Sequence, residues 1–578
     1  MTTDQRHMSE PPLLSVRNLS IRLPEGFDRE YAIEDITYDL DPGEILCVVG
    51  ESGSGKSMTA NAIMGLLPEL LKPVRGSIEY RGRDLLTLPE EEKRELRGRD
   101  IAMVFQEPLS ALNPLMTVGE QIDEVLLVHG ETDSGVRLKR VLELLDFVGL
   151  PEPATIRNSY PFRLSGGQRQ RVVIAMALAL EPSILIADEP TTALDVTTQA
   201  QILDLIKRIQ RIKGMGVIFV THDFGVVADI ADRVIVMEKG LVVEQGTAEQ
   251  VLNQPRHPYT QRLIAAVPHG AAAGGSGAAV HEQAPLLELR DLNKTYRTGG
   301  GLFSKPRVVP AVQHVSLTLH RGQTLGVVGE SGSGKSTLGR IIIKLLQSDS
   351  GQILYHGQDI APLSQAAFRP MRKRIQMIFQ DPFASLNPRH TVGRILTDGP
   401  VANGVARPEA RQRAEELLAL VGLDASAYGR YPHEFSGGQR QRIGIARALM
   451  LDPDLLIADE SVSALDVSVQ EQVLRLLKEI QERLQLGMIF ITHDLRVAAQ
   501  ICDDIIVMRR GEVVESGPAA RIFDAPQHEY TQRLIAAIPG KDWNPRQVIE
   551  SLQEEPSDVA HASPASRTLR WGTADPAA

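Results

Sequence analysis

Short apolar runs rich in branched side chains alternate along this chain with longer segments in which polar and apolar positions are mixed. Residues 45–49, 184–187, 216–221 and 455–458 are runs of this kind, and their length and composition are typical of buried strands. Strands that alternate with helix-like segments predict α/β domains built on a mostly parallel sheet. No uncharged apolar run approaches the ~18 residues that a membrane-spanning helix needs.

The pattern of runs and glycine-rich turns occurs twice. Gly-Glu-Ser-Gly-Ser-Gly-Lys-Ser at 50–57 returns at 329–336, and Ser-Gly-Gly-Gln at 165–168 returns at 436–439. The spacing between copies shrinks only slowly along the chain, which indicates two homologous domains rather than a solenoid, whose repeat spans ~50 residues at most. We predict a first domain at 1–268, an Ala/Gly-rich linker at 269–284, a second domain at 285–540 and a disordered tail at 541–578.

Both glycine-rich segments fit the P-loop pattern Gly-x-x-x-x-Gly-Lys-Ser, and each follows a short apolar strand. The glycines let backbone N–H groups converge on phosphate oxygens, helped by the positive end of the next helix. Lys56 and Lys335 are expected to reach the β- and γ-phosphates of ATP, while Ser57 and Ser336 place a hydroxyl on Mg²⁺. A glycine turn with a surface lysine is the alternative, and two matches in register disfavour it. The predicted ATP-binding residues of the two loops are Gly50, Glu51, Ser52, Gly53, Ser54, Gly55, Lys56, Ser57, Gly329, Glu330, Ser331, Gly332, Ser333, Gly334, Lys335 and Ser336.

Each P-loop is followed at long range by an apolar strand that ends in two acids, Asp188-Glu189 and Asp459-Glu460. Carboxylates at the carboxyl end of a parallel strand lie in the crevice where open α/β sheets bind ligands. The aspartates suit Mg²⁺, and the glutamates are placed to polarise an attacking water. Acids after a strand also cap helices, but a P-loop in the same repeat favours catalysis.

Four further features occur in the same order in both copies. Leu-Ser-Gly-Gly-Gln at 164–168 and Phe-Ser-Gly-Gly-Gln at 435–439 resemble the signature loop of ABC ATPases. The remaining matches to this family are the Q-loop glutamines Gln106 and Gln380, the D-loops at 193–195 and 464–466, and the switch histidines His222 and His493. A single histidine after a strand is usually structural, but the repeated order favours catalytic sites. The chain resembles the fused two-cassette ATPases of ABC transporters.

This resemblance implies two tandem P-loop domains, each with a mostly parallel sheet core, a helical signature subdomain and a small antiparallel sheet. It implies head-to-tail cassettes with ATP held between one P-loop and the opposite signature loop, so that Lys56 shares ATP with Ser436 and Lys335 with Ser165. The implied catalytic residues are Glu189, Glu460, His222, His493, Gln106 and Gln380. The implied Mg²⁺ ligands are Ser57, Ser336, Gln106, Gln380, Asp188 and Asp459. The implied signature contacts to ATP are Ser165, Gly166, Gly167, Gln168, Ser436, Gly437, Gly438 and Gln439.

Family members also stack the adenine on an aromatic residue upstream of the P-loop. Tyr296 fits that role in the second copy, whereas the aligned residue of the first copy is Leu23. Two alternatives follow for the first copy: Tyr31 takes the role, or the site holds the base more loosely.

Two segments indicate a subfamily. A nine-residue segment at 255–263, centred on His-Pro-Tyr-Thr-Gln, recurs with changes at 526–534, and Leu-Asn-Pro follows both Q-loop glutamines. They resemble the dipeptide, oligopeptide and nickel importers, whose fused members include glutathione and microcin C peptide importers; packing motifs are the alternative interpretation. The resemblance implies an ATP-hydrolysing motor for import of peptides or similar small solutes, at the cytoplasmic face of the inner membrane. Its implied partners are two transmembrane permease subunits and an extracytoplasmic solute-binding protein, and the solute does not touch this chain.

Composition narrows the alternatives. The formal net charge of −11, with both signs scattered along the chain, disfavours a nucleic-acid partner. Cys47 and Cys502 are the two cysteines, so neither a disulfide scaffold nor the iron–sulfur motif of some single-cassette relatives is expected. Cys47 lies in an apolar run and is expected to be a core thiol. The polar segment 1–12 has no signal-peptide core, which predicts a cytoplasmic protein.

Two other classes of protein also carry such motifs. Soluble twin-cassette proteins that act on ribosomes or nucleic acid usually join their cassettes by a long, charged helical linker, whereas this linker is nearly uncharged. A regulatory sensor would bind nucleotide without hydrolysing it, which the glutamates Glu189 and Glu460 disfavour. The transport motor is therefore the leading hypothesis.

Overall fold

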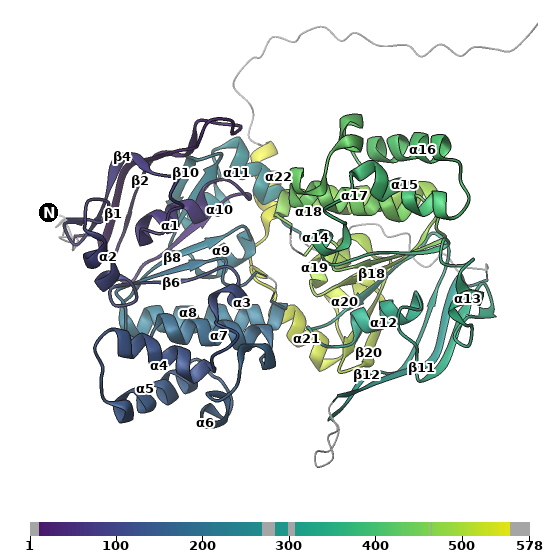
Figure 1. Cartoon of the computed structure of the whole chain (residues 1–578), viewed down its shortest axis with the longest axis horizontal. Coiled ribbons are helices and arrows are strands. Elements are labelled where there is room, and N and C mark those ends of the chain that lie inside the picture. The colour runs from purple at the N-terminus through teal and green to yellow at the C-terminus, as the bar shows by residue number, and fades with distance from the viewer. Residues whose placement is uncertain (1–10, 193, 269–283, 299–306, 464, 555–578) are drawn as a thin grey trace, which may run out of the picture.

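The chain folds into two α/β domains of the same design (Figure 1). The computed structural model describes residues 11–192, 194–268, 284–298, 307–463 and 465–554. Each domain has a six-stranded sheet, in which five neighbouring strands run parallel, and a four-stranded antiparallel sheet. The predicted fold class is confirmed, including the small antiparallel sheet. Most of the predicted linker, 269–283, lies outside the described residues.

The first domain holds β1 to β10. Its antiparallel sheet has the order β2-β1-β4-β5, and its mixed sheet the order β10-β9-β3-β8-β7-β6. The strands are β1 (Leu14–Arg22), β2 (Tyr31–Leu40), β3 (Ile45–Val49), β4 (Pro73–Tyr80), β5 (Arg83–Asp84), β6 (Ile101–Val104), β7 (Ile184–Asp188), β8 (Gly216–Thr221), β9 (Arg233–Glu238) and β10 (Leu241–Thr247). The helices are α1 (Lys56–Met64), α2 (Glu90–Leu96), α3 (Pro108–Ala111), α4 (Val118–Val128), α5 (Ser134–Phe147), α6 (Pro153–Ile156), η1 (Pro161–Arg163), α7 (Gly166–Ala177), α8 (Val196–Lys213), α9 (Phe224–Ile230), α10 (Ala248–Asn253) and α11 (Pro258–Ala265).

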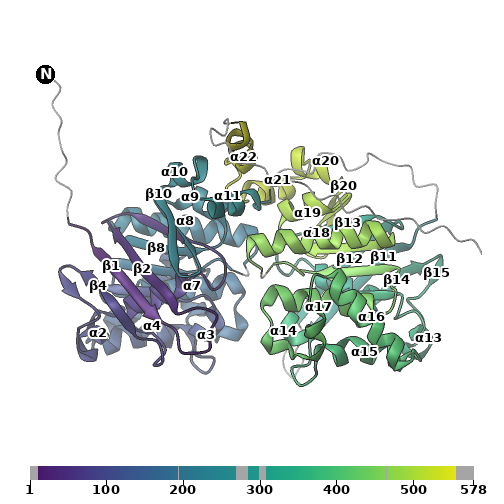
Figure 2. The same cartoon turned by 90° about the horizontal axis from the view of Figure 1, so that it is seen from above.

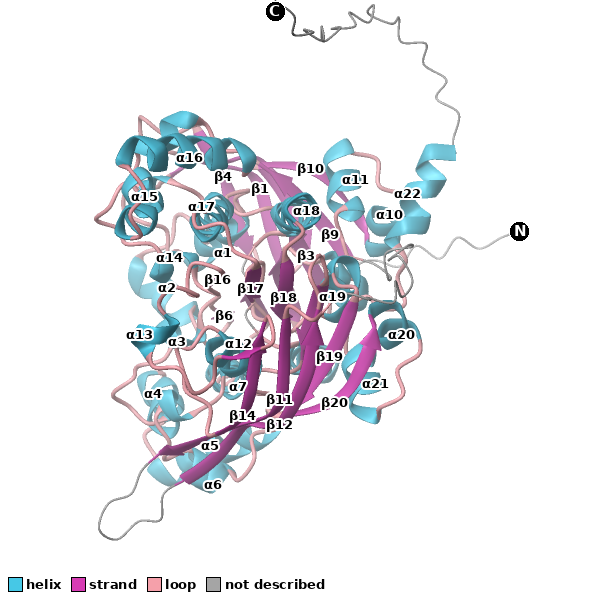
Figure 3. Ribbon diagram, turned by 90° about the vertical axis from the view of Figure 1, so that its right-hand side faces the viewer, coloured by secondary structure: helices cyan, strands magenta, loops and turns pink. Residues whose placement is uncertain are grey.

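The second domain repeats this plan, with sheet orders β12-β11-β14-β15 and β16-β17-β18-β13-β19-β20; Figure 3 shows β17, β18, β19 and β20 of the mixed sheet. The strands are β11 (Leu287–Thr298), β12 (Arg307–Leu319), β13 (Thr324–Val328), β14 (Ser350–Tyr355), β15 (Gln358–Asp359), β16 (Ile375–Ile378), β17 (Leu455–Asp459), β18 (Gly487–Thr492), β19 (Asp504–Arg509) and β20 (Glu512–Pro518). The helices are α12 (Lys335–Ile342), α13 (Gln365–Phe368), α14 (Pro382–Ser385), α15 (Val392–Ala402), α16 (Arg407–Leu420), η2 (Ala425–Gly429), η3 (Pro432–Glu434), α17 (Gly437–Leu449), α18 (Val467–Leu484), α19 (Leu495–Ile501), α20 (Ala519–Asp524), α21 (Glu529–Ala536) and α22 (Pro545–Glu554).

Strand β3 shows why the central strands are continuously apolar. All five of its residues are buried, because successive side chains point to opposite faces of the sheet and both faces are covered. Ile45, Cys47 and Val49 join the core that contains the helices, while Leu46 and Val48 join the core under the antiparallel sheet. Cys47 is fully buried, as expected of a core thiol.

The two domains lie side by side in opposite orientations. In Figure 1, α4, α5 and α7 lie at the bottom of the first domain, whereas α15, α16 and α17 lie at the top of the second. These helices form the predicted helical subdomains, which places the two subdomains at opposite ends of the molecule. Within the described residues, every helix is too short or too polar to span a bilayer.

The predicted disorder of the tail is wrong for residues 545–554, which form α22. This helix packs on α10 and α11 of the first domain, and Figure 2 shows it beside them. Trp543 and Ile549 contact the first domain's core. The Pro-, Ser- and Ala-rich composition of the tail concealed this short amphipathic segment; residues 555–578 lie outside the described part of the chain.

Candidate functional site

Each P-loop joins a parallel strand to a helix at the centre of its domain, β3 to α1 and β13 to α12. Gly50 has φ 152° and Gly55 φ 105°, and a Cβ on either would collide with neighbouring atoms, so only glycine suits these turns. The amine of Lys56 donates to the carbonyls of Gly50 and Glu51 at 2.7 and 2.9 Å. Lys335 repeats this with its own loop.

The helices that follow the P-loops leave a place for an anion. Neither α1 nor α12 has a side-chain cap at its N-terminus, so no side chain of the cap residue takes the place of an anion there. Burial lowers the pKa of Lys56, while the carboxylates of Glu189 and Asp466 oppose that shift. A phosphate would satisfy both the amine and the helix N-terminus.

A residue pair from the two segments that indicated the subfamily contacts the P-loops directly. The hydroxyl of Tyr259, on α11, accepts a hydrogen bond from the N–H of Glu51 at 3.2 Å. Tyr530, on α21, accepts one from Glu330 at the same distance. Both tyrosines belong to the recurring His-x-Tyr-Thr-Gln segments; the recurrence marked these segments, and the structure shows their contact with the P-loops.

The aspartates at the ends of β7 and β17 lie against the P-loop serines. Ser57 donates to Asp188 at 3.0 Å, and Ser336 donates to Asp459 at 2.9 Å. Burial raises the pKa of Asp188, because little water reaches the end of the strand. A hydroxyl, a carboxylate and phosphate oxygens form the oxygen-rich, partly hydrated donor set that Mg²⁺ prefers, so these residues fit that cation.

Each glutamate is held by a glutamine and a histidine from distant segments. The side-chain amide of Gln106 donates to Glu189 at 2.9 Å, and Gln380 donates to Glu460 at 2.6 Å. Nδ1 of His222 lies 3.4 Å from a carboxylate oxygen of Glu189. The corresponding distance from His493 to Glu460 is 3.8 Å. The predicted Q-loop, acidic and switch residues thus converge in both domains.

The glutamates have an unusual backbone conformation, and their carboxylates stay ionised although little water reaches them. Glu189 and Glu460 have φ 45° and 44°, a left-handed conformation that a side chain with Cβ rarely adopts and that clusters at functional sites. Burial alone would raise the pKa of Glu189, but His222 and Lys56 lower it to about 2. The carboxylate is therefore ionised and aimed by its backbone.

The signature loops begin helices α7 and α17. Ser165 and Gln168 form a capping box, as do Ser436 and Gln439. Both serines are exposed, and in the described part of the chain no hydrogen bond joins either one to a P-loop. The structure therefore presents these helix N-termini to solvent, where they can meet an anion.

The D-loops bring the two domains together. Oδ1 of Asp466 accepts a hydrogen bond from the N–H of Ser52 in the first P-loop at 3.0 Å, and Ser468 donates to Glu51. Val196 packs into the core of the second domain, and Val467 packs against that of the first. Ala193 and Ala464 of the predicted D-loops lie outside the described residues.

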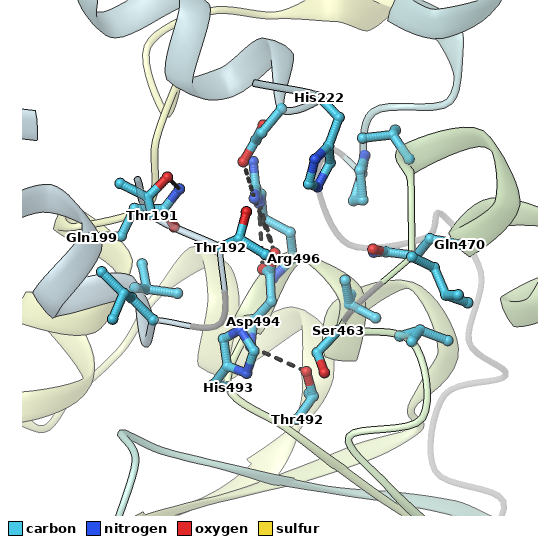
Figure 4. Close-up of a pocket in the computed structure, with 18 of the residues that line it drawn as sticks. Thr191, Thr192, Gln199, His222, Ser463, Gln470, Thr492, His493, Asp494 and Arg496 are labelled. Carbon is cyan, nitrogen blue, oxygen red and sulfur yellow. Dashed lines mark hydrogen bonds and ion pairs between the residues drawn. The ribbon is translucent and has the colours of Figure 1, made fainter. Parts of the chain in front are cut away.

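A pocket lies between the domains where the two switch loops face each other. Its walls include Thr191 and Thr192 of the first domain and Ser463 of the second. Figure 4 shows His222 and His493 on opposite sides, with Arg496 between them. The two candidate sites are thus connected through a polar centre.

The region predicted to hold the adenine differs between the domains. The hydroxyl of Tyr296 lies 3.5 Å from that of Thr337 on α12. In the first domain Leu23 and Met58 occupy the aligned positions, and both pack against the apolar core. Arg22 lies over the ring of Tyr31, 5.8 Å from its centroid.

Arg29 is a further residue that contacts the first P-loop, and no sequence pattern pointed to it. Its guanidinium donates to the carbonyl of Gly53 in the first P-loop. No sequence signal indicated this contact, because the loop before β2 carries no motif.

Comparisons with known proteins extend over both domains. The ABC transporter family matches residues 33–192 and 312–463, and the oligopeptide/dipeptide transporter C-terminal region matches 243–298 and 514–565. The chain is 49% identical over 530 residues to the peptidoglycan transport ATP-binding protein YejF of Agrobacterium fabrum, covering 91% of this chain and 96% of that protein. It is 46% identical over 580 residues to the glutathione import ATP-binding protein GsiA of Salmonella typhimurium, covering 95% and 93%. A solved dimeric ATP-binding cassette in a post-hydrolysis state, bound to ADP and Pi, is 34% identical and covers 41% of this chain and 98% of that chain, with a TM-score of 0.37.

Proposed function

This chain belongs to the ATP-binding proteins of ABC transporters and is a two-cassette ATPase, and we propose that it powers the import of peptides or similar small solutes. The observation that carries the proposal is the complete set of P-loop, acids, glutamine and histidine in both domains, joined by D-loop contacts across the interface. The relatives named for glutathione import and peptidoglycan transport support a peptide-like solute.

Hydrolysis would occur in two composite sites. Lys56 would share one ATP with Ser436, and Lys335 the other with Ser165, because two anion-seeking loops must face each other across the nucleotide. The contact from Ser52 to Asp466 supports this pairing, since it already brings the second domain to the first P-loop. Binding of ATP would draw the exposed signature helices toward the P-loops and close the cassettes.

Within each site, different residues would have different roles in hydrolysis. Glu189 and Glu460 would orient the attacking water and take its proton, with His222 and His493 holding the carboxylates in place. Ser57, Asp188 and Gln106 would hold Mg²⁺ in the first site, and Ser336, Asp459 and Gln380 in the second. Bound Mg²⁺ supplies positive charge that stabilises the phosphates.

The proposed motor works with other subunits. Two transmembrane permease subunits would bind this chain at the cytoplasmic face of the inner membrane, and an extracytoplasmic protein would deliver the solute. The chain would then be a peripheral subunit that contacts neither the solute nor nucleic acid. Its acidic net charge of −11 supports the exclusion of nucleic acid.

The hydrolytic assignment is tested by replacing both glutamates. We expect Glu189→Gln with Glu460→Gln to lower steady-state ATPase by ~10²–10⁴-fold, because an amide cannot accept the proton from water. Binding of labelled ATP should persist. Glu95→Gln with Glu416→Gln, on exposed helices, is the matched control. Turnover near the wild-type rate in the double glutamine variant would refute the assignment.

Import is tested by uptake. Cells that lack this chain should lose ATP-dependent uptake of a labelled dipeptide, oligopeptide or glutathione, and the wild-type chain should restore it where the double glutamine variant does not. Restoration of ribosome-linked activity without any uptake would favour the soluble twin-cassette alternative.

A further inference from the structure

One arginine connects the two switch loops across the domain interface. Arg496, on α19 of the second domain, pairs with Asp494 at 2.9 Å and with Asp223 of the first domain at 3.5 Å. These aspartates directly follow the switch histidines His493 and His222. Figure 4 shows the guanidinium at the centre of this arrangement.

The cluster is partly buried, so each charged group is stabilised mainly by its neighbours in the cluster. The side chains of Arg496, Asp494 and Asp223 are 12%, 18% and 20% exposed. Burial alone would lower the pKa of Arg496, but the two carboxylates raise it, so the guanidinium stays charged. Without the arginine, two carboxylates would face each other with little water between them, which favours separation of the loops.

The repeat does not supply a second such arginine. The position of the first domain that corresponds to Arg496 is Gly225. A Cβ on Gly225 would lie 2.6 Å from the carbonyl oxygen of Pro539 and 3.0 Å from Nη1 of Arg496. The glycine therefore makes room for the arginine of the other domain, and a single side chain serves both loops.

The segment at the end of the second domain also contacts the arginine. The carbonyl of Pro539 accepts a hydrogen bond from Nη1 of Arg496 at 3.3 Å. Gly540 has φ 68° and packs closely on Gly225. A Cβ added to Gly540 would lie 2.6 Å from the Cα of Gly225. Farther along, Nε1 of Trp543 donates to Asn253 at 3.1 Å, and α22 lies on α10 and α11.

From this geometry we propose that Arg496 is a positioning residue that joins the two switch loops and, with the docked segment 539–554, keeps the cassettes together when no nucleotide is bound. The arginine comes from the second domain and contacts the first, and its counterpart in the first domain is Gly225, which has no side chain. Its effect on turnover rests on the proposed function, whereas its effect on domain association does not.

Association is measured in the full chain without nucleotide. Fluorophores on Glu91→Cys in α2 and Gln412→Cys in α16 report the separation of the domains by energy transfer, and the native thiols are buried. We expect one narrow population for the otherwise wild-type chain. Arg496→Gln should add a second population with lower transfer, and Arg496→Lys should largely restore the first.

Turnover gives the second measurement. We expect Arg496→Gln to lower kcat for ATP by ~10-fold or more, within the ~10²-fold that a 1 Å misplacement can produce. The KM for ATP should change less than about twofold, because the P-loop contacts are intact. Arg137→Gln is the matched control: Arg137 is also 12% exposed and pairs with Asp123 at 2.9 Å, but within one domain.

A second variant removes the anchor without changing the charges. Trp543→Ala should shift the energy-transfer distribution in the same direction as Arg496→Gln, by a smaller amount. A single narrow population in both Arg496→Gln and Trp543→Ala would overturn the proposal, as would separated domains with an unchanged kcat. Absence of ATPase in the wild-type chain would instead refute the proposed function, while the energy-transfer result would still decide the connection between the domains.

Discussion

At the scale of residues, the two sites are alike where phosphate and water are handled and differ where the base is expected. Lys56 and Lys335 donate to matching carbonyls at nearly equal distances. Tyr296 faces the hydroxyl of Thr337, whereas Leu23 and Met58 leave an apolar wall at the aligned positions. This difference predicts unequal adenine binding.

We expect ATP to bind more weakly at the first P-loop than at the second, and Tyr296→Ala to make the affinities similar. Stacking of a base on an aromatic ring is worth ~1–3 kcal/mol, or about tenfold in affinity. Titration of Lys335→Ala and Lys56→Ala variants isolates each site. Equal wild-type affinities, together with a loss confined to the first site in Tyr31→Ala, would show that Tyr31 holds that base.

The ion contact between His222 and Glu189 predicts a pH dependence. Burial alone would lower the pKa of His222, but Glu189, Asp466 and Asp223 raise it. A histidine with a raised folded pKa adds stability that is fully present below the unfolded value of ~6.5 and is lost as pH rises through the folded pKa.

NMR titration of the His222 ring should therefore give a pKa above ~6.5, and Glu189→Gln should lower it. Glu95→Gln, on an exposed helix, should leave the titration unchanged. An unaltered His222 titration in Glu189→Gln would mean that the carboxylate does not stabilise the imidazolium.

Sequence patterns could predict the residues of the motifs but not their long-range neighbours. The acids, glutamines and histidines carry motif spacing, and in the structure Gln106 meets Glu189 across 83 residues. Tyr259 lies 208 residues from Glu51, and Arg29 lies in a loop without a motif, so only the fold reveals their contacts with the P-loop.

At the scale of elements, strands and central helices followed from the alternation of apolar runs, because a buried parallel strand is apolar on both faces. Helix α22 did not, since its stability depends on packing against α10 and α11 rather than on its own ten residues. The close packing of the signature helix against the helix after the D-loop could not be predicted from the sequence either. In both domains it limits the size of the residues where the two helices meet.

We expect Gly167→Ala to destabilise the first domain by about 1–3 kcal/mol, because overpacked methyl groups strain their neighbours. The new Cβ would collide with Cγ2 of Thr198 on α8. Thr198→Ser removes that methyl group and should restore most of the loss, as measured by thermal unfolding. Gly166→Ala is the control, since its Cβ would make an ordinary contact with Leu194 at 3.6 Å. Equal effects of the two alanines would contradict this steric account.

At the scale of the whole molecule, the two domains repeat one design, but the interface between them is asymmetric. The resemblance to ABC ATPases implied head-to-tail cassettes, and in the structure the helical subdomains of the two domains lie at opposite ends of the molecule. The repeat shows that Gly225 of the first domain corresponds to Arg496 of the second. The role of the arginine follows only from the position of Asp223, which pairs with Arg496 in the structure. The D-loops differ as well: Asp195 caps its own helix through Thr198, whereas Asp466 leaves α18 without a side-chain cap.

This difference at the D-loops predicts that Asp466 competes with ATP at the first P-loop. Its carboxylate accepts the N–H of Ser52, a backbone donor of the kind that phosphates use, and brings negative charge to the phosphate position. We expect Asp466→Ala to tighten ATP binding at this site about tenfold, since a hydrogen bond to a charged group contributes ~1.5–3 kcal/mol.

The measurement uses Lys335→Ala, so that nucleotide binds at the first P-loop alone, and compares Asp466→Ala with Asp195→Ala in that background. Asp195 accepts its hydrogen bond from its own domain, and its charge acts on Lys335 of the second P-loop, so its removal should leave the first site unchanged. If Asp466→Ala instead weakens ATP binding, the aspartate supports the nucleotide rather than competing with it.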